Sequence, residues 1–184
     1  ELFRELALEP MDERLDDFRK LAVDNDLLIL VGAPIAGPGE AYIGTLIFQP
    51  DGQTRTYTKY YLHAGEEKWA TAKLTEWSYQ LAGKNVQLAI CAEITNPAHA
   101  AKAAAEKCDL YLASVFISPK GLEPDGAYLE GYAKQYGMQV LMANFGGESC
   151  GYASGGHSAF WNETGEVITE LSHADEGLLT QELL

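Results

Sequence analysis

Short apolar runs alternate with segments of helical spacing along most of the chain. The apolar runs, bounded by glycine, proline and polar residues, predict strands over residues 27–31, 41–48, 54–59, 86–90, 110–115, 139–144, 158–162 and 166–170. Helical spacing predicts helices over residues 12–25, 99–107 and 129–136, the last stopped by Gly137. Strands that alternate with helices are typical of α/β folds, so we expect a sheet with helices on its outer face.

Turn residues and helix periodicity refine these elements. Gly32-Ala33-Pro34 is expected to end the first strand, Gly37-Pro38-Gly39 predicts a turn, and Pro50-Asp51-Gly52 predicts a hairpin between strands 41–48 and 54–59. The first helix should bury one apolar face, made of Leu15, Phe18, Leu21 and Ala22.

Length and charge narrow the class of protein. A chain of 184 residues with 47% apolar content can bury one sizeable core, so residues 1–184 are expected to form a single domain. The 27 acidic and 13 basic residues give a net charge of −14, which disfavours binding to nucleic acid and to anionic membrane surfaces. The chain contains no apolar run long enough to span a membrane, and no signal-peptide pattern opens it.

The cysteines and histidines carry further information. Cys91, Cys108 and Cys150 are an odd number without a Cys-x-x-Cys pair, which fits a reducing cytoplasm better than a disulfide framework. We expect Cys108 to be structural and Cys150 to be a spectator thiol in a glycine-rich loop. The four histidines, including His173, show no metal-ligand spacing, so no metal or cofactor is expected.

Cys91 is the candidate nucleophile. It ends the strand pattern 86–90 and precedes polar turn residues and an alanine-rich helix. Such a strand-to-helix turn lies where open α/β sheets present catalytic groups, and a helix N-terminus favours the nucleophilic thiolate. The alternative interpretation is a small buried hydrophobic residue, as most free cysteines are.

Three motifs resemble the carbon–nitrogen hydrolase (nitrilase) superfamily, and the resemblance covers residues 6–183. Tyr57-x-Lys59-x-x-Leu62 followed by a glutamate resembles the lysine motif, Ile90-Cys91-x-Glu93 resembles the nucleophile elbow, and Gly156-x-Ser158-x-x-Trp161 resembles the late strand pair. The order and spacing of the three make the resemblance specific. It implies an α-β-β-α sandwich, built from two sheet-and-helix halves, in proteins that commonly dimerise.

One departure from the family pattern concerns the N-terminal region. Members of the family carry a first catalytic glutamate in a Phe-Pro-Glu-like segment, and residues 1–184 contain no such segment. Residues 1–7 resemble the region just beyond that glutamate. The resemblance therefore implies an α/β nitrilase-type sandwich that lacks its N-terminal strand–helix–strand.

The resemblance also assigns roles around the nucleophile. Lys59 would stabilise the oxyanion, with Glu67, eight residues later, supporting the lysine and taking part in proton transfer. Glu66 is the competing candidate, and an exposed pair of charges is the structural alternative for both glutamates. The backbone N–H of Ala92 would be a second oxyanion donor. Glu93 could orient the elbow and could equally be a carboxylate favoured at a helix N-terminus.

Substrate choice is expected to reside in loops and aromatic side chains. Phe116 and Phe145 are candidate pocket residues, although isolated aromatics belong more often to the core. The segments 118–127 and 146–156 are predicted to be the loops that select the substrate.

We therefore expect a thiol hydrolase of non-peptide C–N bonds that acts on small amide or N-carbamoyl molecules through a Cys91 thioester and releases ammonia. Two alternatives stay open. One is an acyltransferase or glutaminase-type member that uses the same thioester. The other is a catalytically incompetent fragment or pseudoenzyme that acts by binding or assembly. In each case a homodimer or higher homo-oligomer is expected.

Overall fold

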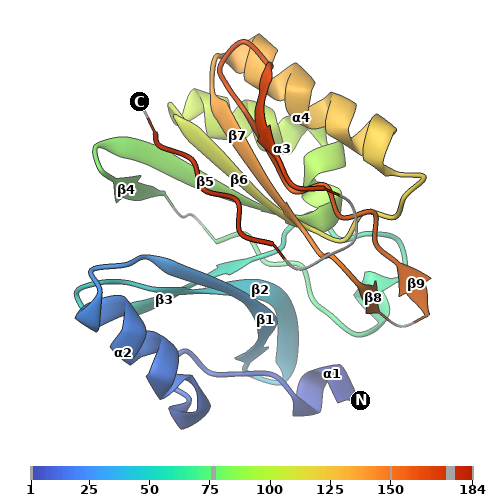
Figure 1. Cartoon of the computed structure of the whole chain (residues 1–184). Helices are drawn as coiled ribbons and strands as arrows, with labels where there is room; N and C mark the ends of the chain where they lie inside the picture. The colour runs from blue at the N-terminus through green and yellow to red at the C-terminus, as the bar shows by residue number, and fades with distance from the viewer. Residues whose placement is uncertain (1, 76–77, 150, 173–176, 184) are drawn as a thin grey trace. The chain divides into compact units, whose positions relative to one another are not determined.

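The computed structural model describes residues 2–75, 78–149, 151–172 and 177–183, and the chain divides into two compact units, Glu1–Trp77 and Ser78–Leu184 (Figure 1). The expectations for Cys150 and His173 fall outside the described residues. We describe each unit by itself.

The first unit is a three-stranded antiparallel sheet with a helix packed on it. Its strands β1 (Ile29–Gly37), β2 (Glu40–Phe48) and β3 (Thr54–Thr58) pair in the order β1-β2-β3. The remaining elements are α1 (Leu2–Glu5), η1 (Glu13–Leu15), α2 (Asp16–Asp24) and η2 (Glu66–Lys68). The predicted strands β2 and β3 and both turns beside them are confirmed.

The first strand is longer than predicted. Gly32-Ala33-Pro34 does not end β1. This strand is at the edge of the sheet: it pairs with β2 along one side and has an isolated parallel bridge, between Leu8 and Ile35, on the other. Proline lacks an N–H and is tolerated at a sheet edge. On that edge the Pro34 carbonyl accepts a hydrogen bond from the Leu8 N–H (2.9 Å), which secures the strand beyond the predicted end.

The predicted first helix is present as η1 followed by α2, but its buried face is narrower than expected. Leu15 and Ala22 are buried, and Phe18 stacks on Phe48 with ring centroids 5.6 Å apart. Phe18 and Leu21 are both exposed, which corrects the prediction that they share the buried face with Leu15 and Ala22.

The second unit is a six-stranded sheet in the order β11-β10-β7-β6-β5-β4. Its central strands β5 (Lys84–Ile90), β6 (Leu110–Val115) and β7 (Gln139–Asn144) are parallel, whereas β4 (Tyr79–Leu81), β10 (Ala159–Trp161) and β11 (Val167–Glu170) are antiparallel to their neighbours. The helical elements are η3 (Cys91–Thr95), α3 (Pro97–Ala105) and α4 (Leu122–Tyr136). The predicted strands β6 and β7 and the late hairpin are confirmed.

Two apolar clusters cover the two faces of this sheet. Helices α3 and α4 lie on one face (Figure 1), where Ala103 and Leu129 pack with Tyr111 and Val140 of the strands. The opposite face buries a smaller cluster built on Val86, Leu110, Phe160 and the partly buried leucines of the C-terminal segment. The prediction of helices on an outer face of the sheet is confirmed for this unit.

Both helices of the second unit begin earlier than predicted. Helix α3 starts at Pro97, because the Asn96 side chain accepts a hydrogen bond from the Ala98 N–H (3.0 Å) and proline is well suited to a first helical position. Helix α4 starts at Leu122, and Pro124 lies in its first turn, where the missing N–H costs nothing. Residues 122–127 are therefore helical and not part of a specificity loop.

The predicted glycine-rich loop 146–156 also contains structure of its own. Its strands β8 (Glu148–Ser149) and β9 (Tyr152–Ala153) form a small antiparallel pair. Gly137 ends α4 in a left-handed conformation (φ 64°), as the sequence predicted. Within the residues that the structure covers, none of the helices has both the length and the apolarity needed to cross a membrane.

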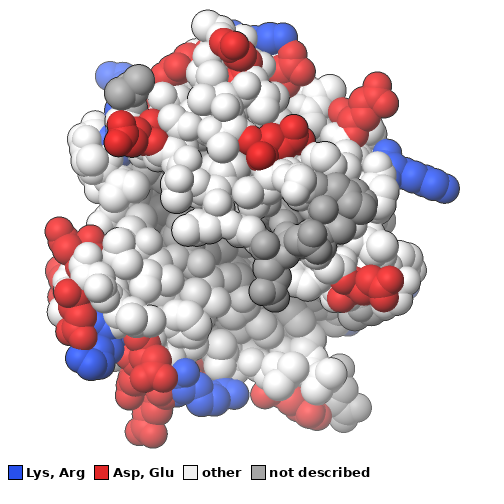
Figure 2. Space-filling model, viewed as in Figure 1, with Lys and Arg blue, Asp and Glu red and all other residues white. Residues whose placement is uncertain are grey.

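Charged side chains are spread over the face of the molecule drawn in Figure 2. Acidic groups outnumber basic ones on that face, in keeping with the net charge of −14. The charges that bear on chemistry are instead buried ones, at the ends of strands.

Candidate active site

Cys91 lies at a sharp turn directly after β5. Its backbone is left-handed (φ 48°), while Ile90 before it is still extended (φ −116°, ψ 112°). A non-glycine residue with positive φ is uncommon, and strained strand-to-helix turns of this kind present a nucleophile at the edge of a sheet. Cys91 is half-buried, whereas Cys108 is buried and its pKa is raised to about 12, chiefly by desolvation.

Strand register places the predicted pocket aromatics at the same sheet edge as Cys91. In the parallel ladders Ile90 pairs with Ser114, and Ser114 pairs with Ala143. Cys91 therefore follows β5 at the same edge of the sheet at which Phe116 follows β6 and Phe145 follows β7. The two phenyl rings are stacked, with centroids 6.0 Å apart. Ligands of open α/β sheets bind at this carboxyl edge.

Asn144 fastens the loops at that edge. Its side-chain oxygen accepts a hydrogen bond from the Ile117 N–H (2.8 Å), and its side-chain nitrogen donates to the Gly156 carbonyl (2.6 Å). Its backbone N–H donates to Ser158 Oγ (3.0 Å). These bonds tie together the segment after β6, the end of β7 and the glycine-rich loop. Asn144 is not among the predicted site residues; its place as the last, polar residue of a buried strand is the signal in the sequence that points to it.

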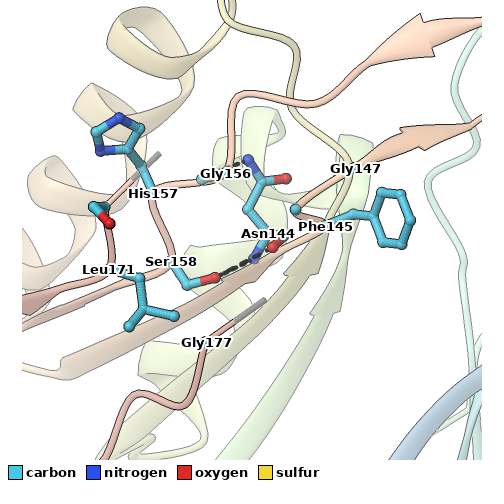
Figure 3. A pocket seen from close by; sticks show the side chains of 10 residues that line it. Asn144, Phe145, Gly147, Gly156, His157, Ser158, Leu171 and Gly177 are labelled. Atoms are coloured by element: carbon cyan, nitrogen blue, oxygen red, sulfur yellow. Dashed lines mark hydrogen bonds between the residues drawn. The ribbon is translucent and has the colours of Figure 1, made fainter. Parts of the chain in front are cut away.

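Beside Asn144 lies a cavity of about 370 Å³, lined in part by Phe145, His157, Ser158 and Leu171 (Figure 3). The Phe145 ring and the His157 imidazole point away from each other on its two sides. His157 has a left-handed backbone (φ 57°), and its Nδ1 lies 2.7 Å from Glu170 Oε1. The cavity is therefore bounded by aromatic, hydroxyl and imidazole groups.

Glu93 is fully buried (0% exposed) two residues after Cys91. Its Oε2 accepts a hydrogen bond from the Ile90 N–H (2.9 Å), the amide that immediately precedes the nucleophile. His99 Nε2 lies 3.7 Å from the same oxygen. Glu93 thus contacts the backbone of the elbow, as expected of a residue that orients it.

Lys59 is a fully buried cation in the first unit (0% exposed), directly after β3. Its Nζ donates to both carboxylate oxygens of Glu66, at 2.8 and 2.7 Å, and the His63 N–H donates to Glu66 Oε2 (2.7 Å). Gly65, with φ 100°, provides the turn that brings Glu66 back towards the lysine.

Glu67 is directed elsewhere. It is exposed, and its Oε2 accepts a hydrogen bond from the Gly65 N–H (2.7 Å). Backbone hydrogen bonds from its own N–H and from that of Gly65 lower the Glu67 pKa. The contact with Lys59 is therefore made by Glu66, the competing candidate, and the catalytic role of Glu67 stays a prediction.

The structure brings together Lys59 and Glu66 in the first unit, and Cys91, Ala92 and Glu93 in the second. The convergence of Cys91 with Lys59 and Glu67 in one cleft stays a prediction. The thiol, the buried cation and the sharp turn between strand and helix are the parts expected of a carbon–nitrogen hydrolase.

Comparison with known families agrees with this interpretation. The sequence matches the carbon–nitrogen hydrolase family over residues 1–183, and the chain belongs to that family. No curated protein matches it in sequence.

Solved structures share the fold at low identity. The amidase from Nesterenkonia sp. AN1, in a variant bound to butyramide, superposes with a TM-score of 0.79 at 22% identity, over 88% of this chain and 63% of that one. Nit3 from Saccharomyces cerevisiae gives 0.84 at 17%, over 95% and 68%. A CN-hydrolase superfamily protein from Xanthomonas campestris, with an arsenic adduct in its active site, gives 0.84 at 17%, over 92% and 68%. The predicted nitrilase-type α/β fold is confirmed, and the chain spans about two thirds of the length of these structures.

Proposed function

We propose that this chain hydrolyses C–N bonds of small amide or N-carbamoyl molecules through a thioester at Cys91, with release of ammonia. The observation that carries the proposal is the left-handed, half-buried Cys91 at the end of β5, at the sheet edge where the cavity beside Asn144 also opens. Family membership supports the reaction class. The butyramide complex of the Nesterenkonia amidase supports small amides as the substrates to test.

The chemistry follows from the residue types. The Cys91 thiolate attacks the carbonyl carbon and forms a C–S bond while the carbonyl oxygen becomes an oxyanion. The C–N bond then breaks, and the nitrogen takes up a proton and leaves as ammonia. Water attacks the thioester, the C–S bond breaks, and the acid is released with the thiol restored.

Charge stabilisation is assigned to two donors. By resemblance to the family, the Lys59 ammonium is the first donor, and the Ala92 N–H, next to the nucleophile, is the second. Glu66 holds the buried lysine side chain in place, since it contacts Nζ through both oxygens. Glu67 is the candidate for proton transfer. The family's first glutamate, which would take the thiol proton, has no counterpart in residues 1–184.

The proposal also covers the oligomeric state and the cellular location of the protein. A homodimer or higher homo-oligomer is expected by resemblance to the family. A cytoplasmic location is expected from three cysteines without a Cys-x-x-Cys pair.

The test is ammonia release from a panel of small amides and N-carbamoyl amino acids, with Cys91→Ala as the key variant and Cys108→Ala as the matched thiol control. We expect release by the wild type and by the Cys108 variant, and none by the Cys91 variant. Release that survives Cys91→Ala would overturn the thioester. A wild type that releases no ammonia from any compound would favour the pseudoenzyme alternative.

A further inference from the structure

The strained turn at Cys91 is held from inside the second unit by groups that the hydrolysis scheme does not use. The left-handed conformation of Cys91 costs free energy, so surrounding contacts must maintain it. The contact closest to the turn is the hydrogen bond from the Ile90 N–H to Glu93 Oε2. What fixes the Glu93 carboxylate therefore also fixes the turn.

His99 and Tyr111 lie behind that carboxylate. His99 Nδ1 is 2.7 Å from Tyr111 Oη, and His99 Nε2 faces Glu93 Oε2 at 3.7 Å. Tyr111 is fully buried on β6, and its pKa is raised well above the ordinary value, first by desolvation and then by Glu93, so it keeps its proton. The Tyr111 hydroxyl then donates to His99 Nδ1, which leaves the Nε2–H directed at the carboxylate.

This tautomer suits the surroundings of His99. Burial is the largest cause that lowers its pKa, so the neutral imidazole is favoured. A neutral ring can accept from Tyr111 and donate towards Glu93 at the same time, which a doubly protonated ring cannot do. The three side chains come from β6, α3 and η3, so the arrangement joins three elements to one backbone amide.

We propose that Tyr111, His99 and Glu93 form a buried relay of positioning residues that holds the Cys91 turn in its left-handed conformation and so sets the reactivity of the thiol. None of the three needs to touch the substrate. The consequence for turnover rests on the proposed function, whereas the consequence for the thiol and for the Ile90 amide does not.

A matched pair of hydroxyl deletions separates this role from general packing. Tyr111→Phe removes the hydroxyl that contacts His99. Tyr132→Phe removes another buried hydroxyl, which donates to the Ile94 carbonyl (2.9 Å) in the same η3 segment but lies outside the relay. The rings of the two tyrosines contact each other, so both substitutions alter the same apolar cluster.

A second pair acts at the imidazole. His99→Leu removes both nitrogen functions. His99→Gln keeps an amide that can donate towards Glu93, and it should restore part of what the leucine variant loses.

Two measurements on the 184-residue chain give the result. The first is the rate of iodoacetamide alkylation at Cys91, followed by peptide mass spectrometry with the buried Cys108 as internal reference. The second is hydrogen exchange of the Ile90 amide. We expect Tyr111→Phe and His99→Leu to slow alkylation about tenfold, since small displacements of a reacting group cost rate steeply, and to speed exchange at Ile90. His99→Gln should fall between, and Tyr132→Phe should match the wild type.

The relay is refuted if Tyr111→Phe and His99→Leu leave Cys91 reactivity unchanged, even if exchange at Ile90 rises. It is equally refuted if Tyr132→Phe slows alkylation as much as Tyr111→Phe does. If the relay variants behave as expected while the wild type releases no ammonia, the relay stands and the proposed hydrolysis fails. In an active enzyme, His99→Leu should lower kcat and leave KM nearly unchanged, because the relay acts on the nucleophile and not on the bound ligand.

Discussion

Among the described residues, a charged side chain is completely buried just after a strand in each unit, and the two side chains have different partners. Lys59, after β3, faces an opposite charge, the Glu66 carboxylate, in a segment seven residues further along the chain. Glu93, after β5, accepts a hydrogen bond from the Ile90 N–H, and the Nε2 of His99 lies 3.7 Å from its carboxylate.

This difference predicts which property of the protein changes when each charged side chain loses a partner. A buried ion pair leaves an uncompensated charge when one partner is removed. A carboxylate that contacts neutral polar groups loses only part of its stabilisation when one of these groups is removed, but the backbone turn that the carboxylate holds can then relax. The lysine should therefore govern stability, and the glutamate should govern the shape of the turn.

The largest expected effect is the removal of the buried cation. Lys59→Met should lower the free energy of unfolding by about 3 kcal/mol, because it leaves the mostly buried Glu66 carboxylate without its partner. Urea denaturation measures the loss. The double variant Lys59→Met/Glu66→Gln should recover part of it, since the unpaired charge is then gone.

The control is a lysine in an exposed ion pair. Lys102 pairs with Glu106 one helical turn away, with both side chains well exposed. Lys102→Met should cost no more than about 0.5 kcal/mol. Equal losses for Lys59→Met and Lys102→Met would contradict the claim that the loss arises from burial of the Lys59–Glu66 pair.

Part of this arrangement could be predicted from the sequence. The thiol of Cys91 and the position of Lys59 follow from local patterns, because an apolar strand that ends abruptly in a polar turn is visible in the residues themselves. Strands β6 and β7 were predicted with their observed bounds for the same reason.

Other parts depend on geometry that no local pattern fixes. Whether Glu66 or Glu67 turns back to Lys59 depends on the left-handed Gly65 and the tight helical turn after it. The contact of His99 with Tyr111 joins a helix to a parallel strand twelve residues away, and it forms only when the sheet does. Helix α4 was predicted to start too late because Pro124 and Gly126 resemble loop residues.

A smaller effect should appear in the pH dependence of stability. Burial lowers the His99 pKa in the folded state, against the opposing effects of Glu93 and Glu106 and together with Lys102. The unfolded chain therefore binds a proton near pH 6.5 that the folded chain does not yet bind. Stability from this group is complete above that pH and is lost as pH falls towards the lower folded pKa.

This effect can be measured as a difference in the slope of the free energy of unfolding against pH. Between pH 7.5 and 5.5, the free energy of unfolding of the wild type should fall more steeply than that of His99→Gln, by at most about 1.4 kcal/mol per pH unit for one proton. Other titrating groups are common to both proteins and cancel in the comparison. Parallel curves would show that His99 takes up its proton equally in the folded and unfolded chains.

The smallest expected effect separates the two adjacent glutamates. The folded pKa of Glu67 lies below its ordinary value of 4.5, because backbone N–H groups bind the carboxylate. Its contribution is therefore present above about pH 4.5 and disappears as pH falls through the lower folded value. Glu67→Gln should be slightly less stable than the wild type at pH 7 and should become equal to it in acid. At pH 7, Glu66→Gln should lower the free energy of unfolding more than Glu67→Gln does. The neutral amide leaves the buried Lys59 side chain without the carboxylate that contacts it through both oxygens. A larger loss for Glu67→Gln would reverse the assignment and return the support of Lys59 to the residue eight positions after it.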